Sequence, residues 1–399
     1  MALSKIDVAN MLTGVTPVAN GGTAATTLAG AGLQKPNLKP IWINGDMAVS
    51  QRATSATGKT AGGYYTVDRI KLDISGTIGT WTVAQESLTS GNAFNNGFAN
   101  AYRIDCTSAT ASPASGAFLK VISSFEGQDL QMFKKGTSNA EKFTLSFWVK
   151  SNKTGTAQVN LRDMDNTRMI GASYSISSAD TWEHKVCNFA ADTTGDFDDD
   201  NAQSLLVEWW LDGGSDYTSG AMPTAWEARA AADSMAAGSL DMAGSTDNDW
   251  AITGVQLEVG EYTSSTLPPF QHEDFGTNMA RCQRYFTMVA DGRLGGGSNE
   301  AFIGAGYCHA GNTNYFACGT LPVRMRTIDP SIFTVTGTNN YKAVREDGED
   351  TFDSIVMYGQ YNQQVFSING TGNVSATQGT GAQVRLHSTS TYFGVDAEL

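Results

Sequence analysis

Short segments in which apolar and polar residues alternate run through most of the chain, and this pattern predicts β-strands. In Phe143–Lys150, the side chains of Phe143, Leu145, Phe147 and Val149 fall on one face, because successive residues of a strand point to opposite sides. Little helical pattern lies between such segments, which favours antiparallel sheets over βαβ units. Further strands predicted in the first two thirds of the chain are Ile41–Met47, Asp68–Asp73, Thr80–Ala84, Ala101–Cys106, Ala157–Leu161, Glu183–Asn188, Leu205–Leu211 and Ile252–Val259.

A second β-rich region follows Thr277–Phe286, which we expect to form a short connecting helix. Gly and Asn separate its strands, and a small β-sandwich is a natural arrangement for a segment of this length. The strands predicted here are Ala301–Tyr307, Leu321–Arg326, Ser331–Val335, Ser354–Tyr358, Gln363–Ile368, Gln383–His387 and Tyr392–Val395.

Val15–Leu33, within the first forty residues, shows neither the two-residue period of a strand nor the 3.6-residue period of a helix. Val15–Leu33 consists mostly of Gly, Ala and Thr, without a charged or aromatic residue, and cannot bury enough apolar surface to offset its ordering entropy. We expect this leader to become ordered within an assembly. The predicted fold is therefore all-β: an extended N-terminal leader over residues 1–40, a β-sandwich over residues 41–275 and a smaller C-terminal β-sandwich over residues 276–399.

One helix is predicted inside the first β-region. Thr224–Glu227 matches a capping box, the sequence is rich in alanine as far as Ala237, and Gly238 is a typical helix stop. This helix would decorate the long loop between the strands Leu205–Leu211 and Ile252–Val259.

The charge balance narrows the range of partners. The chain has 40 acidic and 26 basic residues and a net charge of −14, whereas nucleic-acid phosphates are bound by basic clusters, so we expect no nucleic-acid partner. No apolar run reaches the roughly 18 residues that cross a bilayer, and we expect no membrane insertion. Five widely spaced cysteines without a CxxC motif are typical of small buried side chains in a chain made in a reducing cytoplasm.

We expect no metal ion, no cofactor and no enzyme activity. Asp196–Asp200 begins like an EF-hand loop, but Asn201 and Val207 replace the turn glycine and the bidentate glutamate, so a solvated acidic loop is predicted. His272–Gly276 is not an HExxH motif. Paired carboxylates could cleave glycans, but the repeat of a β-helix depolymerase is absent from the sequence.

Aromatic residues near the long loop are candidates for sugar stacking. They are Tyr217, Trp226 and Trp210. Trp209 and Trp210 point to opposite faces of their strand, so at least one belongs to the core, and Trp226 is equally suited to anchoring the predicted helix. Tyr217 is the most loop-like of the three, and loop residues more often carry function.

Several segments together resemble tail-fibre proteins of tailed bacteriophages that carry a jelly-roll domain similar to carbohydrate-binding modules. Gly21–Leu28 resembles a GGTGAT-type segment near the start of such proteins. The remaining resemblances are at Ile43–Met47, Gln51–Arg52, Tyr65–Arg69, Phe125–Leu130, Leu145–Ser151, Thr253–Gly260, Pro269–His272, Cys282–Phe286 and Asp396–Leu399.

The resemblance implies a structural virion protein, usually a homotrimer, that adheres to a host-surface glycan or protein. Its N-terminus would attach to other tail proteins of the virion. The residues expected to make this attachment are Val15, Gly21, Gly22, Thr23 and Leu28. Two alternatives remain open: a capsid or collar decoration fibre without a receptor role, and a glycan-cleaving tailspike.

Overall fold

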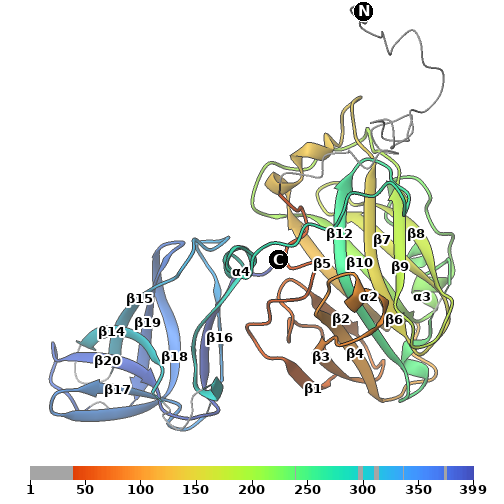
Figure 1. Ribbon diagram of the computed structural model, residues 1–399. Helices are drawn as coiled ribbons and strands as arrows, with labels where there is room; N and C mark the ends of the chain where they lie inside the picture. Colours follow the sequence, from red (N-terminus) through yellow and green to blue (C-terminus); the bar gives the residue numbers. More distant parts are fainter. Residues whose placement is uncertain (1–38, 239, 295–299, 310–313, 336, 373–374) are drawn as a thin grey trace, which may run out of the picture.

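The molecule consists of two β-lobes joined through one helix, α4 (Phe275–Gln283), as Figure 1 shows. This computed structural model describes residues 39–238, 240–294, 300–309, 314–335, 337–372 and 375–399. The all-β class predicted from the sequence is confirmed, and so is the connecting helix. In the described residues, the remaining helical segments are single turns: α2 (Gly91–Asn95), α3 (Ser215–Thr218), η2 (Gly127–Asp129), η3 (Gln131–Phe133), η4 (Ala231–Asp233), η5 (Met242–Gly244) and η6 (Gly292–Leu294).

Two antiparallel six-stranded sheets form the N-terminal lobe. The first has the order β1 (Ser55–Lys59), β3 (Thr80–Ser87), β4 (Asn100–Ser108), β12 (Asp249–Val259), β6 (Phe143–Ser151), β9 (Glu183–Phe189). The second has the order β11 (Glu227–Ala228), β8 (Arg168–Ile176), β7 (Gly155–Asp163), β10 (Gln203–Gly213), β5 (Phe118–Glu126), β2 (Lys71–Ser75).

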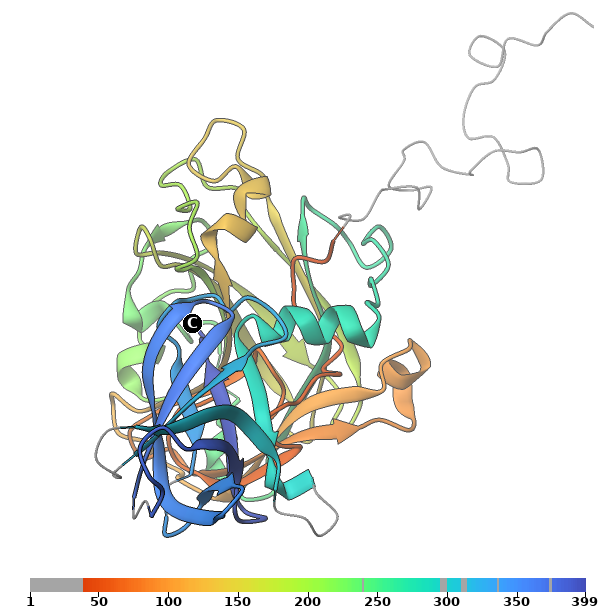
Figure 2. The same cartoon turned by 90° about the vertical axis from the view of Figure 1, so that its left-hand side faces the viewer.

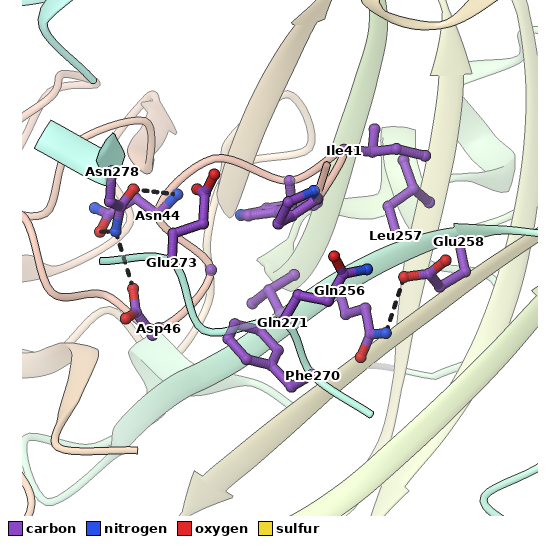
Figure 3. A pocket seen from close by; sticks show the side chains of 14 residues that line it. Ile41, Asn44, Asp46, Gln256, Leu257, Glu258, Phe270, Gln271, Glu273 and Asn278 are labelled. Carbon is purple, nitrogen blue, oxygen red and sulfur yellow. Dashed lines mark hydrogen bonds between the residues drawn. The ribbon is translucent and has the colours of Figure 1, made fainter. Parts of the chain in front are cut away.

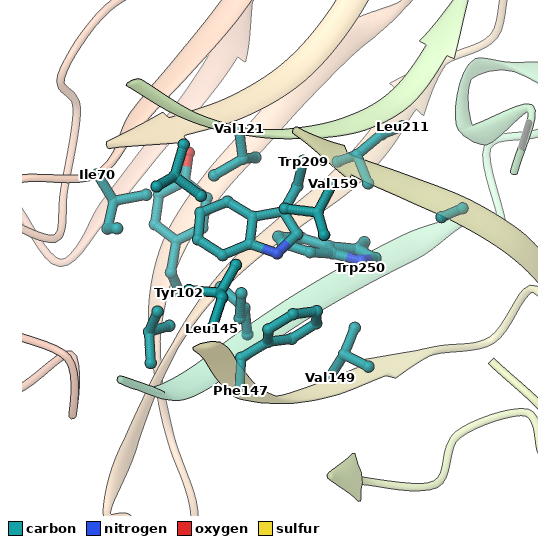
Figure 4. Close-up of a cluster of buried hydrophobic side chains, with 14 of the residues drawn as sticks. Ile70, Tyr102, Val121, Leu145, Phe147, Val149, Val159, Trp209, Leu211 and Trp250 are labelled. Carbon is teal, nitrogen blue, oxygen red and sulfur yellow. The ribbon is translucent and has the colours of Figure 1, made fainter. Parts of the chain in front are cut away.

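The two sheets enclose a core of aromatic and branched side chains, seen in Figure 4. Trp209 of β10 is fully buried, and its ring lies 5.7 Å from Phe147 of β6 and 6.5 Å from Trp250 of β12. Burying a large apolar side chain contributes about 1.5–3 kcal/mol, so this cluster is a main source of the lobe's stability. The alternation predicted for Phe143–Lys150 is thereby explained, because its apolar face forms part of this core.

The C-terminal lobe closes on itself. Six strands form a barrel in the order β14 (Phe302–His309), β15 (Asn314–Thr320), β19 (Val365–Gly372), β18 (Gly348–Asn362), β17 (Tyr341–Arg345), β20 (Gly381–Leu386). Beside it lies a three-stranded sheet of β13 (Phe286–Asp291), β21 (Tyr392–Asp396) and β16 (Ser331–Thr334).

A small sandwich was predicted here, and glycines account for the difference. A Cβ atom at Gly306 would overlap the carbonyl oxygen of Phe316, and one at Gly370 would overlap the ring of Phe352. Glycine therefore lets neighbouring strands and core rings approach closely enough for the sheet to curl and close.

Three predicted elements are absent from the described residues. Ile41–Met47 forms a turn instead of a strand, because Asn44 has a φ of 60° and its side-chain amide bonds the backbone of Val49 and Asp68. Leu321–Arg326 is likewise not a strand.

The helix predicted over residues 224–237 is also wrong. The Nε1 atom of Trp226 donates to the carbonyl oxygen of Ala190 at 2.8 Å, and Glu227–Ala228 pairs with β8. These contacts with remote segments hold the chain extended, and tertiary contacts of this kind override helix propensity.

Buried charges hold the two lobes together. The guanidinium of Arg52, which is 1% exposed, pairs with Asp396 at 2.9 Å and with Glu398 at 3.4 Å. Arg69 also pairs with Glu398, and its guanidinium lies 3.4 Å from the centroid of the Tyr285 ring. Both arginines belong to the N-terminal lobe, so Glu398 neutralises two buried positive charges from the other side of the junction.

A second contact reinforces this junction. Arg284, just after α4, makes a bidentate pair with Glu126 of β5 at 2.6 and 2.8 Å. These hydrogen bonds hold the pKa of the Glu126 carboxyl below its ordinary value although burial acts in the opposite direction. Bidentate arginine pairs fix orientation as well as distance, so the junction is a defined interface.

We expect Glu398→Ala to destabilise the N-terminal lobe although residue 398 lies outside its sheets. The change leaves Arg52 and Arg69 short of a buried partner, and breaking such a pair costs about 3 kcal/mol. Urea unfolding followed by tryptophan fluorescence measures this loss, because all eight tryptophans lie between residues 42 and 250. Glu141→Ala is the control: it breaks an exposed pair with Lys134 and is expected to cost less than about 1 kcal/mol. Equal losses in the two variants would contradict the role of Glu398.

Candidate functional site

A groove lies on the outer face of the first sheet, over β9, β6 and β12, with a volume of about 390 Å³. Aromatic side chains line part of it, together with Leu267, Pro268 and Pro269 and with amide and hydroxyl groups. The aromatic members are Phe98, Trp148, His184, Phe270 and His272, and the polar ones include Asn96, Gln256 and Ser264.

Trp148 of β6 and His184 of β9 line the groove from the sheet, and we call their surface the groove floor. Phe147 and Val149, the neighbours of Trp148, are fully buried in the core, so the alternation of β6 turns the indole outward, where it is partly exposed. Trp148 lies directly opposite His184 of β9 in the antiparallel pairing of β6 and β9. Their ring centroids are 5.0 Å apart, and the angle between the two ring planes is 32°. The indole and imidazole therefore form one continuous surface.

A bulge in β12 brings the floor and one wall together. The register of β12 against β6 shifts between Thr253 and Gln256, and Gly254 within it has a φ of 59°. A Cβ atom at Gly254 would lie 2.6 Å from Cζ of Phe98 and 2.9 Å from Cδ1 of Trp148. Glycine at this position therefore allows both rings to pack over the strand, and bulges often re-aim side chains beside functional sites.

The same wall is extended by the segment that leads into α4. The rings of Phe98 and Phe270 are 4.9 Å apart, and His272 lies 5.3 Å from Phe98 and 4.8 Å from Phe270. His272 is exposed and Phe270 is partly exposed. These residues follow β12 by more than ten positions, so the wall depends on how this segment is held.

A much smaller cavity, drawn in Figure 3, shares Phe270 and Gln256 with the groove and has a volume of about 20 Å³. Asn278 of α4 donates to Asp46 at 3.2 Å and to Asn44 at 3.3 Å beside it. The buried donors Trp42 Nε1 and Gln271 Nε2 line this cavity without a partner among the described residues. A space of this size with two free donors suits one water molecule, so the cavity serves packing rather than ligand binding.

The groove has the chemistry of a carbohydrate site. A sugar ring presents C–H groups on its faces and hydroxyls around its rim, which matches flat aromatic surfaces bordered by amides and hydroxyls. Burial and the neighbouring Lys185 ammonium lower the pKa of His184 below its ordinary value, so this imidazole is neutral at pH 7. The floor formed by Trp148 and His184 is therefore uncharged.

The three candidates chosen from the sequence lie outside this groove. Trp210 is 1% exposed and its Nε1 atom donates to Glu208 at 3.2 Å, and Trp226 is 8% exposed. Neither side chain leaves a ring face free for stacking. Tyr217 of α3 is partly exposed, and its ring centroid lies 5.1 Å from that of Trp210. The structure therefore brings Tyr217 and Trp210 into contact, whereas Trp226 packs elsewhere, against Phe143. The expected attachment residues Val15, Gly21, Gly22, Thr23 and Leu28 lie outside the described residues.

The sequence carried a usable signal for Trp148 that the choice of loop aromatics overlooked. In Phe143–Lys150 the apolar side chains occupy the odd positions, and Trp148 is a large aromatic residue at an even one. An aromatic residue on the polar face of a half-buried strand is a candidate for binding. Its partners Phe98, Phe270 and His272 are remote in sequence and carry no comparable signal.

Across the part of the chain that the structure describes, no three His, Cys, Asp or Glu side chains converge in a way that would hold a metal ion. Asp196, Asp198, Asp199 and Asp200 are exposed, as a solvated acidic loop would be. Four of the five free cysteines are buried, and Cys318 is exposed. No helix within the described ranges is long and apolar enough to cross a bilayer.

No family model and no curated protein matches the chain. Among solved structures, it is similar to the enzymatically active domain of tailspike protein 4 of bacteriophage CBA120, with 12% identity, a TM-score of 0.28 and coverage of 55% of this chain and 21% of that one. It is also similar to a putative sugar binding protein from Bacteroides thetaiotaomicron, with 15% identity and a TM-score of 0.27. This match covers 55% of this chain and 100% of that one. The family 11 carbohydrate-binding module of the cellulase Lic26A-Cel5E of Clostridium thermocellum matches with 10% identity, a TM-score of 0.26 and coverage of 52% and 99%. The chain spans about a fifth of the tailspike domain.

The lowered pKa of His184 predicts a pH dependence of stability. A base whose folded pKa lies below its unfolded value stabilises the fold above that unfolded value, near 6.5, and this contribution is lost as the pH falls. The free energy of unfolding should therefore decrease between pH 7.5 and pH 5 more steeply in the wild type than in His184→Asn. Parallel curves for wild type and His184→Asn would refute the assignment.

Proposed function

We propose that the groove binds a glycan, and that the chain is a structural virion protein of the tail-fibre type that adheres to the host surface. The observation that carries the binding proposal is the outward-facing Trp148, paired with neutral His184 and accompanied by partly exposed Phe270 and exposed His272, which pack against the buried ring of Phe98. The tail-fibre assignment rests on the ordered set of sequence segments from Gly21–Leu28 to Asp396–Leu399.

The proposed mechanism is adhesion without turnover. In this proposal the protein is a homotrimer located in the virion tail, residues 1–40 attach it to other tail proteins, and neither a cofactor nor a metal takes part. Three weak glycan sites on one trimer, repeated over several fibres, add through avidity, so each groove can bind weakly. A host-surface protein in place of a glycan remains the alternative receptor.

Trp148→Ala is expected to weaken glycan binding at least tenfold, about 1.4 kcal/mol, because the central stacking surface is lost. A glycan array of the full chain identifies the ligand, and titration calorimetry with the best hit gives the affinity. Tyr217→Ala is the matched control, since it removes a partly exposed aromatic residue from the other candidate position. Loss of binding in Tyr217→Ala with full binding in Trp148→Ala would move the site to α3.

The location on the virion is a separate matter and needs its own experiment. An antibody against residues 276–399, followed by electron microscopy of labelled virions, is expected to mark the tail. Label over the head or collar would replace the tail-fibre assignment with a decoration fibre, while leaving glycan binding by the groove unaffected.

A further inference from the structure

One side of the C-terminal barrel is poor in charged residues. The strands β14, β15, β19 and β18 are consecutive neighbours in the barrel, as seen in Figure 1. The first three contain no Asp, Glu, Lys or Arg, and the last charged residue of β18 is Asp353. This is unusual for a chain with 40 acidic and 26 basic residues.

Large apolar side chains are exposed on this side. Tyr307 is 47% exposed, Val356 50% and Tyr358 56%. The Phe316 ring links the two tyrosines, because its centroid lies 6.3 Å from Tyr307 and 4.2 Å from Tyr358, and it stacks on His309 at 4.3 Å. We call Tyr307, His309, Phe316, Val356 and Tyr358 the barrel face.

Strand order places Val356 within the same surface. Residue Asn369 of β19 pairs with Phe316 on one side and with Val356 on the other. The barrel face therefore has members on β14, β15 and β18 and crosses β19 at Asn369. Because the barrel is closed, these strands offer no free edge for strand addition, and a partner can only contact their side chains.

We propose that the barrel face is the surface through which copies of this chain associate. Two copies each carry a charge of −14 and repel each other, and an uncharged face is where they can meet with the least repulsion. Its composition agrees with this partner, since interface cores are enriched in aromatic residues and depleted of charged ones. The exposed aliphatic Val356 favours protein contact over a sugar, whose hydroxyls need polar partners.

The barrel face would supply the contact surface of the homotrimer, and in this respect it rests on the proposed function. Association of copies and glycan binding can nevertheless be lost separately. The groove lies in the other lobe, so calorimetry of glycan binding and measurement of association test separate residues. Loss of one property with retention of the other is therefore a readable result.

The first test is sedimentation velocity of the full chain at several concentrations. The double variant Val356→Asp, Tyr358→Asp places two negative charges in each copy of the barrel face and is expected to weaken association at least 100-fold. Ile328→Asp is the matched control, because Ile328 is 65% exposed in the same lobe but outside the barrel face. It should associate as the wild type does.

The second test uses the one exposed cysteine as a probe. Cys318 follows Phe316 by two residues on β15, so it lies on the same side, and the other four cysteines are buried. Its reaction with an aromatic disulfide reagent should be several-fold slower in the wild type than in the double variant. An introduced carboxylate disfavours the reactive thiolate, so a faster reaction in the variant reports exposure.

The two measurements together decide the proposal. A faster Cys318 reaction in the double variant supports it even if residues 1–40 keep the copies together in sedimentation. A monomeric wild type at all concentrations, or a double variant that changes neither measurement, overturns it. More than one reactive thiol per chain would indicate that the double variant has exposed a buried cysteine, and Tyr307→Asp on β14 is then measured in its place.

Discussion

The turn at residues 41–47 packs against β12, and this contact sets the geometry of both the groove and the junction between the lobes. The amide of Val255, within the bulge of β12, donates to the carbonyl oxygen of Gly45 at 2.9 Å. A Cβ atom at Gly45 would overlap the carbonyl oxygen of Val255, so only glycine allows this approach. The turn therefore supports the same bulge against which the rings of Phe98 and Trp148 pack at Gly254.

Helix α4 is held by the same turn. Asn278 bonds Asn44 and Asp46, and Arg281 donates to the carbonyl oxygen of Pro40 at 2.7 Å and pairs with Glu273 at 2.6 Å. The segment with Phe270 and His272 is thus fixed at both ends, by β12 before it and by α4 after it. The groove wall is consequently a by-product of how the two lobes are joined, and a change at the junction is felt in the groove.

Local patterns predicted much of the fold and little of the site. The strand Phe143–Ser151 turns its odd-numbered apolar side chains into the core, so its alternation is visible in the sequence. Gln203–Gly213 is buried on both faces and is marked instead by its short apolar run. The turn at Asn44 and the extended chain at Trp226 depend on partners that are remote in sequence, and local patterns there indicated a strand and a helix. The outward direction of Trp148 could be predicted from alternation. Its apposition to Phe270 depends on the docking of α4, which no local pattern encodes.

The groove and the barrel face are chemically distinct, and this difference separates their proposed roles. The groove joins aromatic rings to Asn96, Gln256 and Ser264 and holds a defined volume, as a small polar ligand requires. The barrel face is open, uncharged and partly aliphatic, as a protein contact requires. Buried arginine–carboxylate pairs link the lobes that carry them, and broken pairs of this kind leave unpaired charges at high cost. Association through the barrel would therefore hold several grooves in fixed relative directions, which is the condition under which weak sites add most effectively.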